Sequence, residues 1–167
     1  MDCSWTGGAV YNLPGQEVSV ERKEISILIV EDDDDARAAL LTFLGNEYTC
    51  IAAANAEEAM RLIGARIFNL VLTDIHLPGA SGLELCRFVY AMSPATVMMV
   101  MTGMADIRYR CKALGQGVLY CIEKPVDLHR LQVWIESGLK CQALAASRHR
   151  QHQPTSTAFR THWLKAS

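Results

Sequence analysis

The sequence predicts an α/β protein with three layers, in which five helices cover the two faces of a sheet of five parallel strands. Two observations support this fold class. From residue 25 onward, short apolar runs alternate with amphipathic stretches, as expected when strands and helices follow one another along the chain. The first run, residues 25–30, carries apolar residues at consecutive positions, which is typical of strands that are buried on both faces.

We expect the chain to have three segments. Residues 1–24 combine glycines, a proline and a charged run without sustained periodicity, which predicts a flexible N-terminal extension. Residues 25–145 carry the alternating pattern and should form a single domain, since 167 residues, half of them apolar, can bury one core. Residues 146–167 are polar and predict a C-terminal tail that frays.

The first elements are bounded by acidic residues. The strand at residues 25–30 ends in acid, and Asp34 or Asp35 can cap a helix that runs to about residue 44. Residues 48–53 then predict the second strand.

The middle of the chain repeats this arrangement. Asn55 can cap a second helix, and residues 68–73 form the third apolar run, which also ends in acid. A turn at Pro78-Gly79 precedes a third helix at about residues 82–91.

The last part of the chain supplies two more strands and two more helices. Residues 96–101 and 118–122 predict the fourth and fifth strands, with a weaker helix over residues 105–114 between them. An amphipathic helix over about residues 128–144 closes the domain.

Net charge, cysteine spacing and the length of apolar runs indicate which partners the protein binds and in which compartment it works. The net charge of -2 gives no general attraction to nucleic acid or to anionic membranes, so neither is expected as a direct partner. The six cysteines are scattered without zinc-like spacing, which indicates reduced thiols. No apolar run approaches the roughly 18 residues of a membrane span, and we therefore expect a cytoplasmic protein.

Polar residues stand where the predicted strands end. Because the carboxyl ends of parallel strands share one edge of a sheet, these separated positions should converge on one small site. They are Glu31 and Asp32 after the first strand, Asp74 after the third, Thr102 after the fourth and Lys124 after the fifth.

The chemistry of these residues indicates a metal and a phosphoryl group. Three clustered carboxylates repel one another unless a cation lies among them, and ligands that are all oxygen suit Mg²⁺. A carboxylate can also attack phosphorus to give an aspartyl phosphate. Lys124 and the metal can neutralise the transferring group, and the Thr102 hydroxyl can hydrogen-bond one of its oxygens.

Four segments of the chain resemble motifs of the receiver domain of bacterial two-component response regulators, in the chemotaxis-regulator-like superfamily. They are ILIVEDD at 27–33, NLVLTDIHLPGASGLEL at 69–85, MVMTG at 99–103 and IEKP at 122–125. The resemblance covers roughly residues 25–145. It implies a flavodoxin-like sheet with strand order 2-1-3-4-5.

The resemblance also implies roles for individual residues. Asp74 takes the place of the phosphoacceptor, and Asp32 and Asp74 would bind Mg²⁺ directly. The backbone carbonyl of His76 would complete the protein ligands, and Glu31 would act through water. Lys124 would bind phosphate.

Thr102 matches the hydroxyl that moves inward when such domains are phosphorylated. The family commonly has Tyr or Phe three residues before the lysine, and this ring moves with the hydroxyl. Cys121 occupies that position here, and the neighbouring Tyr120 should point to the opposite face of the sheet. We therefore expect an altered aromatic switch.

The resemblance implies a phosphoryl donor and an output surface. The donor would be a sensor histidine kinase or a phosphotransfer protein, and the domain would be a phosphoacceptor for signalling rather than a conventional enzyme. Its output would be a change in protein contacts at the face of the fourth helix, fifth strand and fifth helix, which could also form a homodimer. The downstream target would be another protein or an output domain absent from this chain.

Other interpretations stay open at this point. The chain could be the receiver portion of a transcription factor without its DNA-binding domain, or a degenerate receiver that binds partners without phosphorylation. A phosphatase that uses an aspartyl phosphate would need a substrate-binding cap, and no insertion is long enough to form one. Single residues also have structural interpretations: Asp74 or Lys124 could occupy turns, and Thr102 could simply end a strand.

Overall fold

A computed structural model describes residues 9–13, 16–20, 22–103 and 117–151, with side chains described over 22–103 and 117–144. Five parallel strands form the central sheet in the spatial order β4-β3-β5-β6-β7. Numbered along the domain, this is the order 2-1-3-4-5, which confirms the prediction. The strands are β3 (Ser26–Val30), β4 (Thr49–Ala53), β5 (Leu70–Asp74), β6 (Val97–Thr102) and β7 (Val118–Glu123).

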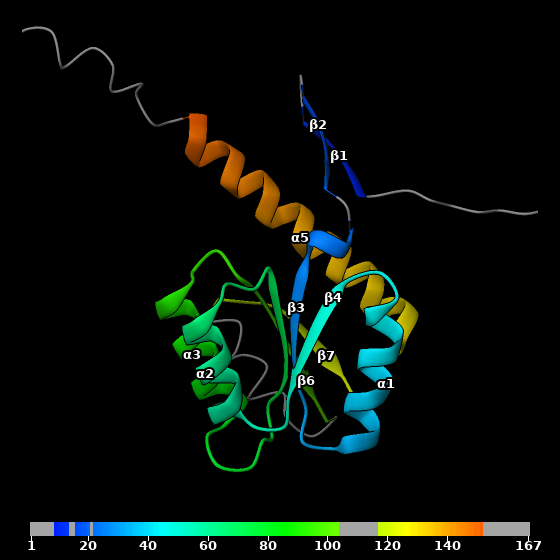
Figure 1. The fold of residues 1–167 in the computed structure, drawn as a ribbon, viewed down its shortest axis with the longest axis vertical. Coiled ribbons are helices and arrows are strands. Elements are labelled where there is room, and N and C mark those ends of the chain that lie inside the picture. Colours follow the sequence, from blue (N-terminus) through cyan, green and yellow to red (C-terminus); the bar gives the residue numbers. More distant parts are fainter. Residues whose placement is uncertain (1–8, 14–15, 21, 104–116, 152–167) are drawn as a thin grey trace, which may run out of the picture.

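Helices cover both faces of this sheet (Figure 1). On one face lie α1 (Asp34–Gly45) and α5 (Leu128–Gln151), and on the other lie α2 (Ala56–Ala65) and α3 (Gly82–Met92). The predicted helix over residues 105–114 lies outside the described residues. Among the described helices, none is both long enough and apolar enough to cross a membrane.

The core is split in two by the sheet, because successive residues of a strand point to opposite faces. Ile27 and Ile29 pack with α1 and α5, whereas Leu28 and Val30 pack with α2 and α3. All four side chains are fully buried. The residues of β3 are therefore apolar at consecutive positions because both faces of the strand are buried, as the sequence pattern indicated.

The observed cap residue matches the predicted one at the start of α2 and differs from it at the start of α1. Asn55 caps α2 as predicted, and its side chain accepts a hydrogen bond from the Glu58 N–H at 2.9 Å. The prediction for α1 was wrong by one residue, because Asp33 is the cap and accepts from the Ala36 N–H at 2.8 Å. Asp34 and Asp35 occupy the first turn, where the helix dipole also favours negative charge.

Both ends of the described chain carry more regular structure than the sequence indicated. The strands β1 (Ala9–Leu13) and β2 (Gln16–Val20) form an antiparallel hairpin, followed by the short helix η1 (Arg22–Glu24). No helix or strand was expected in this segment, although a Pro-Gly pair between two short runs is a turn signal. At the other end, α5 continues to Gln151, beyond the predicted end near residue 144.

Arg22 joins the N-terminal segment to the domain. Its guanidinium forms ion pairs with Glu47, before β4, and with Glu136 of α5, the latter at 2.9 Å. Burial acts to lower the pKa of Arg22, but the charges of Glu47 and Glu136 outweigh it, and the pKa is raised. Arg22 therefore stays charged and links η1 to α5.

Candidate functional site

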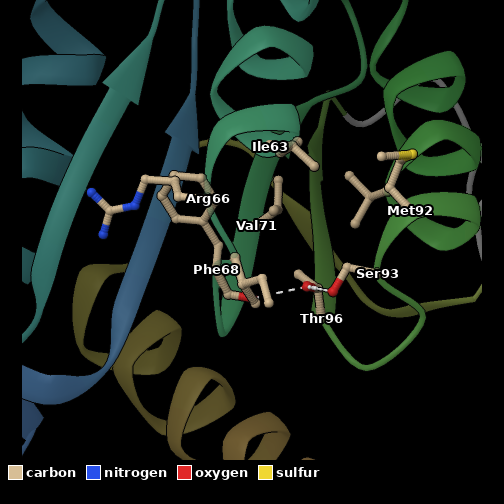
Figure 2. Close-up of a pocket in the computed structure, with 9 residues that line it drawn as sticks. Ile63, Arg66, Phe68, Val71, Met92, Ser93 and Thr96 are labelled. Carbon is tan, nitrogen blue, oxygen red and sulfur yellow. Dashed lines mark hydrogen bonds between the residues drawn. The ribbon is translucent and has the colours of Figure 1, made fainter.

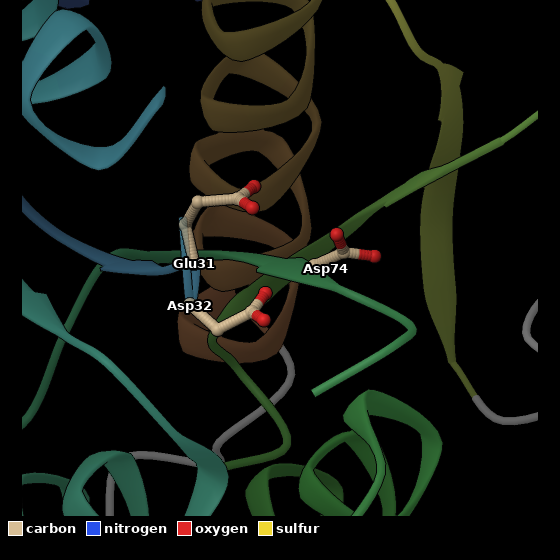
Figure 3. A group of neighbouring side chains, drawn as sticks. All are labelled: Glu31, Asp32 and Asp74. Atoms are coloured by element: carbon tan, nitrogen blue, oxygen red, sulfur yellow. The ribbon is translucent and has the colours of Figure 1, made fainter. Parts of the chain in front are cut away.

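Three carboxylates gather at the carboxyl edge of the sheet (Figure 3). Glu31 and Asp32 follow β3, and Asp74 ends the neighbouring strand β5. Because Val30 is the register partner of Thr73, the residues that follow them lie side by side. Ligand atoms of the three carboxylates all lie within 4.8 Å of one another.

Lys124 brings a positive charge to this cluster from the far side of β6. Its Nζ donates a hydrogen bond to Glu31 Oε1 at 2.9 Å and forms an ion pair with Asp74 Oδ2. The Lys124 backbone N–H donates to the Thr102 carbonyl at 2.8 Å, which ties the lysine to the end of β6. The structure therefore brings the predicted lysine to the predicted phosphoacceptor.

Burial and pairing oppose each other in setting the pKa values of Glu31 and Lys124. Glu31 is only 1% exposed, and this burial raises its pKa against the lowering effect of Lys124. Burial acts to lower the pKa of Lys124, but its hydrogen bonds to Asp74 and Glu31 outweigh it, and the pKa is raised. Lys124 is consequently an ammonium at neutral pH.

The donor set fits a divalent cation. At their formal charges, three carboxylates and one ammonium sum to about -2, which a dication would neutralise. The ligands are all oxygen, and Asp32 is exposed, so a hydrated ion can reach the cluster. These properties match the preferences of Mg²⁺.

His76 contributes through its backbone. Its N–H donates a hydrogen bond to Asp74 Oδ1 at 3.0 Å, while its side chain is exposed. With Lys124 on the other oxygen, both oxygens of the Asp74 carboxylate have partners. The loop that follows β5 therefore holds the carboxylate in a fixed orientation.

Thr102 ends β6 next to this cluster. Its side chain is fully buried, and its backbone follows Met101, the register partner of Asp74. The Thr102 Oγ1 lies 3.4 Å from the carbonyl oxygen of Gly103, which is a long and weak hydrogen bond. The hydroxyl is thus only loosely held.

Cys121 and Tyr120 occupy opposite faces of β7, as predicted. Cys121 packs against the core shared with α2 and α3. Tyr120 instead stacks on Trp134 of α5, with ring centroids 6.3 Å apart, and its hydroxyl donates to Ser137 Oγ at 3.2 Å. Tyr120 therefore cannot take the place of an aromatic ring at position 121.

Two residues that sequence analysis missed hold the backbone around the site. Arg37 of α1 donates from Nη1 to the carbonyl oxygen of Glu31 at 2.8 Å. Glu57 of α2 accepts a hydrogen bond from the backbone N–H of Ala80 at 2.9 Å. Both contacts depend on packing between separate elements, and no spacing in the sequence indicates them.

A second hollow lies at the opposite edge of the sheet, between the ends of α2 and α3 (Figure 2). Its polar groups already have partners, since Thr96 Oγ1 donates to the Phe68 carbonyl at 2.8 Å and lies 2.9 Å from Ser93 Oγ. Arg66 lies over the Phe68 ring at 5.0 Å. The hollow offers no cluster of reactive groups, so the acidic edge is the better candidate site.

Fold and site together define an α/β domain with an acidic site at the carboxyl edge of a parallel sheet. Residues 27–136 match the family described as "Response regulator receiver domain". This match covers more than half of the chain, and the chain therefore belongs to the response regulator receiver family.

Individual relatives agree with this family. The chain is 34% identical over 114 residues to the Response regulator protein PilR of Pseudomonas aeruginosa, which covers 68% of this chain and 26% of PilR. It is also 34% identical over 117 residues to a Cyclic di-GMP phosphodiesterase of Thermotoga maritima, covering 70% of this chain and 31% of that protein. The chain thus spans about a quarter to a third of the curated relatives it matches.

A solved structure supports the fold over the whole domain. The response regulator receiver domain protein (CheY-like) of Methanospirillum hungatei JF-1 is 32% identical, with a TM-score of 0.70. The alignment covers 72% of this chain and 98% of that one. The receiver fold thus accounts for most of the chain described here.

Proposed function

We propose that this chain is a phosphorylation switch in which Asp74 accepts a phosphoryl group from a phosphohistidine of a sensor kinase or phosphotransfer protein. The observation that carries the proposal is the Asp74 carboxylate, which is held between Lys124 and the His76 N–H beside two further acids. Only 6% of Asp74 is exposed, so its backbone and its partners fix the direction from which phosphorus can approach.

The transfer is an in-line displacement at phosphorus. A carboxylate oxygen of Asp74 forms the new P–O bond while the P–N bond to the donor histidine breaks, and the electron pair leaves with the imidazole. The Lys124 ammonium then pairs with the phosphoryl oxygens instead of the free carboxylate, and the Thr102 hydroxyl can donate to one of them.

Mg²⁺ is the proposed cofactor. Asp32, Asp74 and the His76 backbone carbonyl would hold it directly, with Glu31 acting through water. When bound, Mg²⁺ supplies positive charge that neutralises the phosphoryl group and the surrounding acids.

The proposed output is a change in protein contacts at the surface of β7 and α5, together with the helix predicted over residues 105–114, which lies outside the described residues. This surface could bind a downstream protein or a second copy of the chain. We place the protein in the cytoplasm, where its proposed kinase partners expose their phosphohistidines. The four cysteines whose side chains are described form no disulfide bond, as expected in a reducing compartment.

Phosphorylation by acetyl phosphate tests the proposal. In the presence of Mg²⁺ we expect the intact mass of the protein to rise by one phosphoryl group, and we expect Asp74→Asn to remain folded without this gain. Asp33→Asn is the matched control, because it removes a nearby charge outside the carboxylate cluster and keeps an N-cap side chain. Equal labelling of wild type and Asp74→Asn would exclude Asp74 as the acceptor.

A further inference from the structure

We infer that Glu57 is a positioning residue for the metal, because its carboxylate holds the loop that carries the His76 carbonyl. This inference rests on the proposed function and adds a residue from α2, an element that supplies none of the proposed ligands. The two partners, Glu57 and Ala80, are 23 residues apart in the sequence.

The loop between β5 and α3 is held by the backbone at its two ends. The Ile75 N–H donates to the Met101 carbonyl at 3.1 Å, and the Gly82 N–H donates to the Ile75 carbonyl at 3.0 Å. Leu77 is 9% exposed and packs into the core near the start of the loop. These contacts leave the outer arc, residues 78–80, to be held by other groups.

Glu57 provides that contact. Its Oε1 accepts a hydrogen bond from the Ala80 N–H at 2.9 Å. The same oxygen lies 2.6 Å from the place that a Cβ on Gly79 would occupy, so the carboxylate lies directly against the turn. Gly79 has a φ of 78°, which glycine adopts without strain.

The position of Glu57 in the first turn of α2 could be explained by the helix dipole alone. That explanation does not account for the contact with Ala80. The bond to the Ala80 N–H is the main cause of a lowered pKa for Glu57, so the carboxylate is ionised at neutral pH. A charged acceptor forms a stronger hydrogen bond than a neutral one.

A loop that is already ordered loses less conformational entropy when the carbonyl at its start binds a cation. Release of Ala80 should loosen the arc from Pro78 to Ala80 and make the adjacent His76 carbonyl a poorer ligand. The expected consequence is weaker Mg²⁺ binding with little change in the stability of the fold, because Glu57 is exposed.

Two substitutions separate the hydrogen bond from the charge. Glu57→Ala and Glu57→Gln remove the same negative charge, but only the glutamine keeps an acceptor oxygen for the Ala80 N–H. Alanine and glutamine are both good helix formers, so both variants should fold. Three quantities are measured for each: exchange of the Ala80 amide without Mg²⁺, Mg²⁺ affinity from amide shifts, and the urea unfolding curve.

For Glu57→Ala we expect faster exchange at Ala80 and Mg²⁺ binding weaker by about threefold to tenfold, the effect of one net hydrogen bond on an equilibrium. Glu57→Gln keeps a weaker, neutral acceptor and should lose clearly less than the alanine variant, about twofold to threefold. Equal losses in the two variants, or no loss in either, would overturn the role of Glu57. Failure of the wild type itself to bind Mg²⁺ at Asp32 and Asp74 would instead remove the proposed metal site and this inference together.

Discussion

At the scale of single residues, the fold disfavours the charged form of Glu31. This residue is almost completely buried at the end of β3, and burial raises its pKa above the ordinary value. The Lys124 ammonium offsets part of this cost. Glu31 therefore supplies negative charge to the site at some expense to stability, as functional residues often do.

The raised pKa of Glu31 predicts how replacing this residue changes the dependence of stability on pH. A carboxyl whose pKa is raised on folding binds its proton more tightly in the native state, so its contribution to stability is present below about pH 4.3 and is lost as the pH rises. Relative to wild type, Glu31→Gln should thus gain stability between pH 4 and pH 7. The gain should be modest, because the Lys124 ammonium offsets part of the cost of burying the Glu31 charge.

Urea denaturation without Mg²⁺ at the two pH values measures this difference. A difference in unfolding free energy between the two proteins that is the same at both pH values would contradict the raised pKa of Glu31.

At the scale of elements, the strands and most helices could be predicted, because apolar runs and caps are local signals. The five strands of the central sheet were found within two residues of their ends. The predicted cap of α1 was wrong because Asp33, Asp34 and Asp35 are consecutive and have the same side chain, so the sequence does not distinguish them. The β1-β2 hairpin was missed because cross-strand pairing, rather than any periodicity of its five-residue strands, defines it.

The start of α1 gives a second prediction. Asp33→Ala removes the acceptor for the Ala36 N–H and should lower the unfolding free energy by about 1 kcal/mol. Asp33→Asn should lose only a few tenths, because asparagine is an equally good cap. Thermal or urea unfolding compares the two, and equal losses would indicate that charge rather than capping stabilises this end.

The face of β7 gives a third prediction. Cys121 lies on the core face shared with α2 and α3, and the much larger ring of a tyrosine at this position would alter the packing against β6. Cys121→Tyr should change the amide shifts that phosphorylation produces along β6 and β7. Tyr120→Phe is the control, since it removes only the hydroxyl bond to Ser137 on the other face. An unchanged response in Cys121→Tyr would mean that position 121 takes no part in the switch.

At the scale of the whole molecule, the site exists because four parallel strands end at one edge. This convergence could be predicted from the sequence, since it depends only on the strand order and on the residues at the end of each strand. It could not predict the contacts of Arg37 and Glu57, because these depend on how helices pack beside the loops. The acids, the lysine and the hydroxyl can thus be located from the local sequence at the strand ends. The groups that orient them depend on tertiary packing.

The most direct test of the switch is an amide spectrum of the isotope-labelled protein with Mg²⁺, recorded with and without beryllofluoride, which mimics a phosphoryl group on the acceptor. We predict shifts at Thr102 and along β7 in the wild type, and none in Asp74→Asn. Identical shifts in the two proteins, or no shifts in either, would contradict a switch centred on Asp74 and favour a receiver fold that binds its partners without phosphorylation.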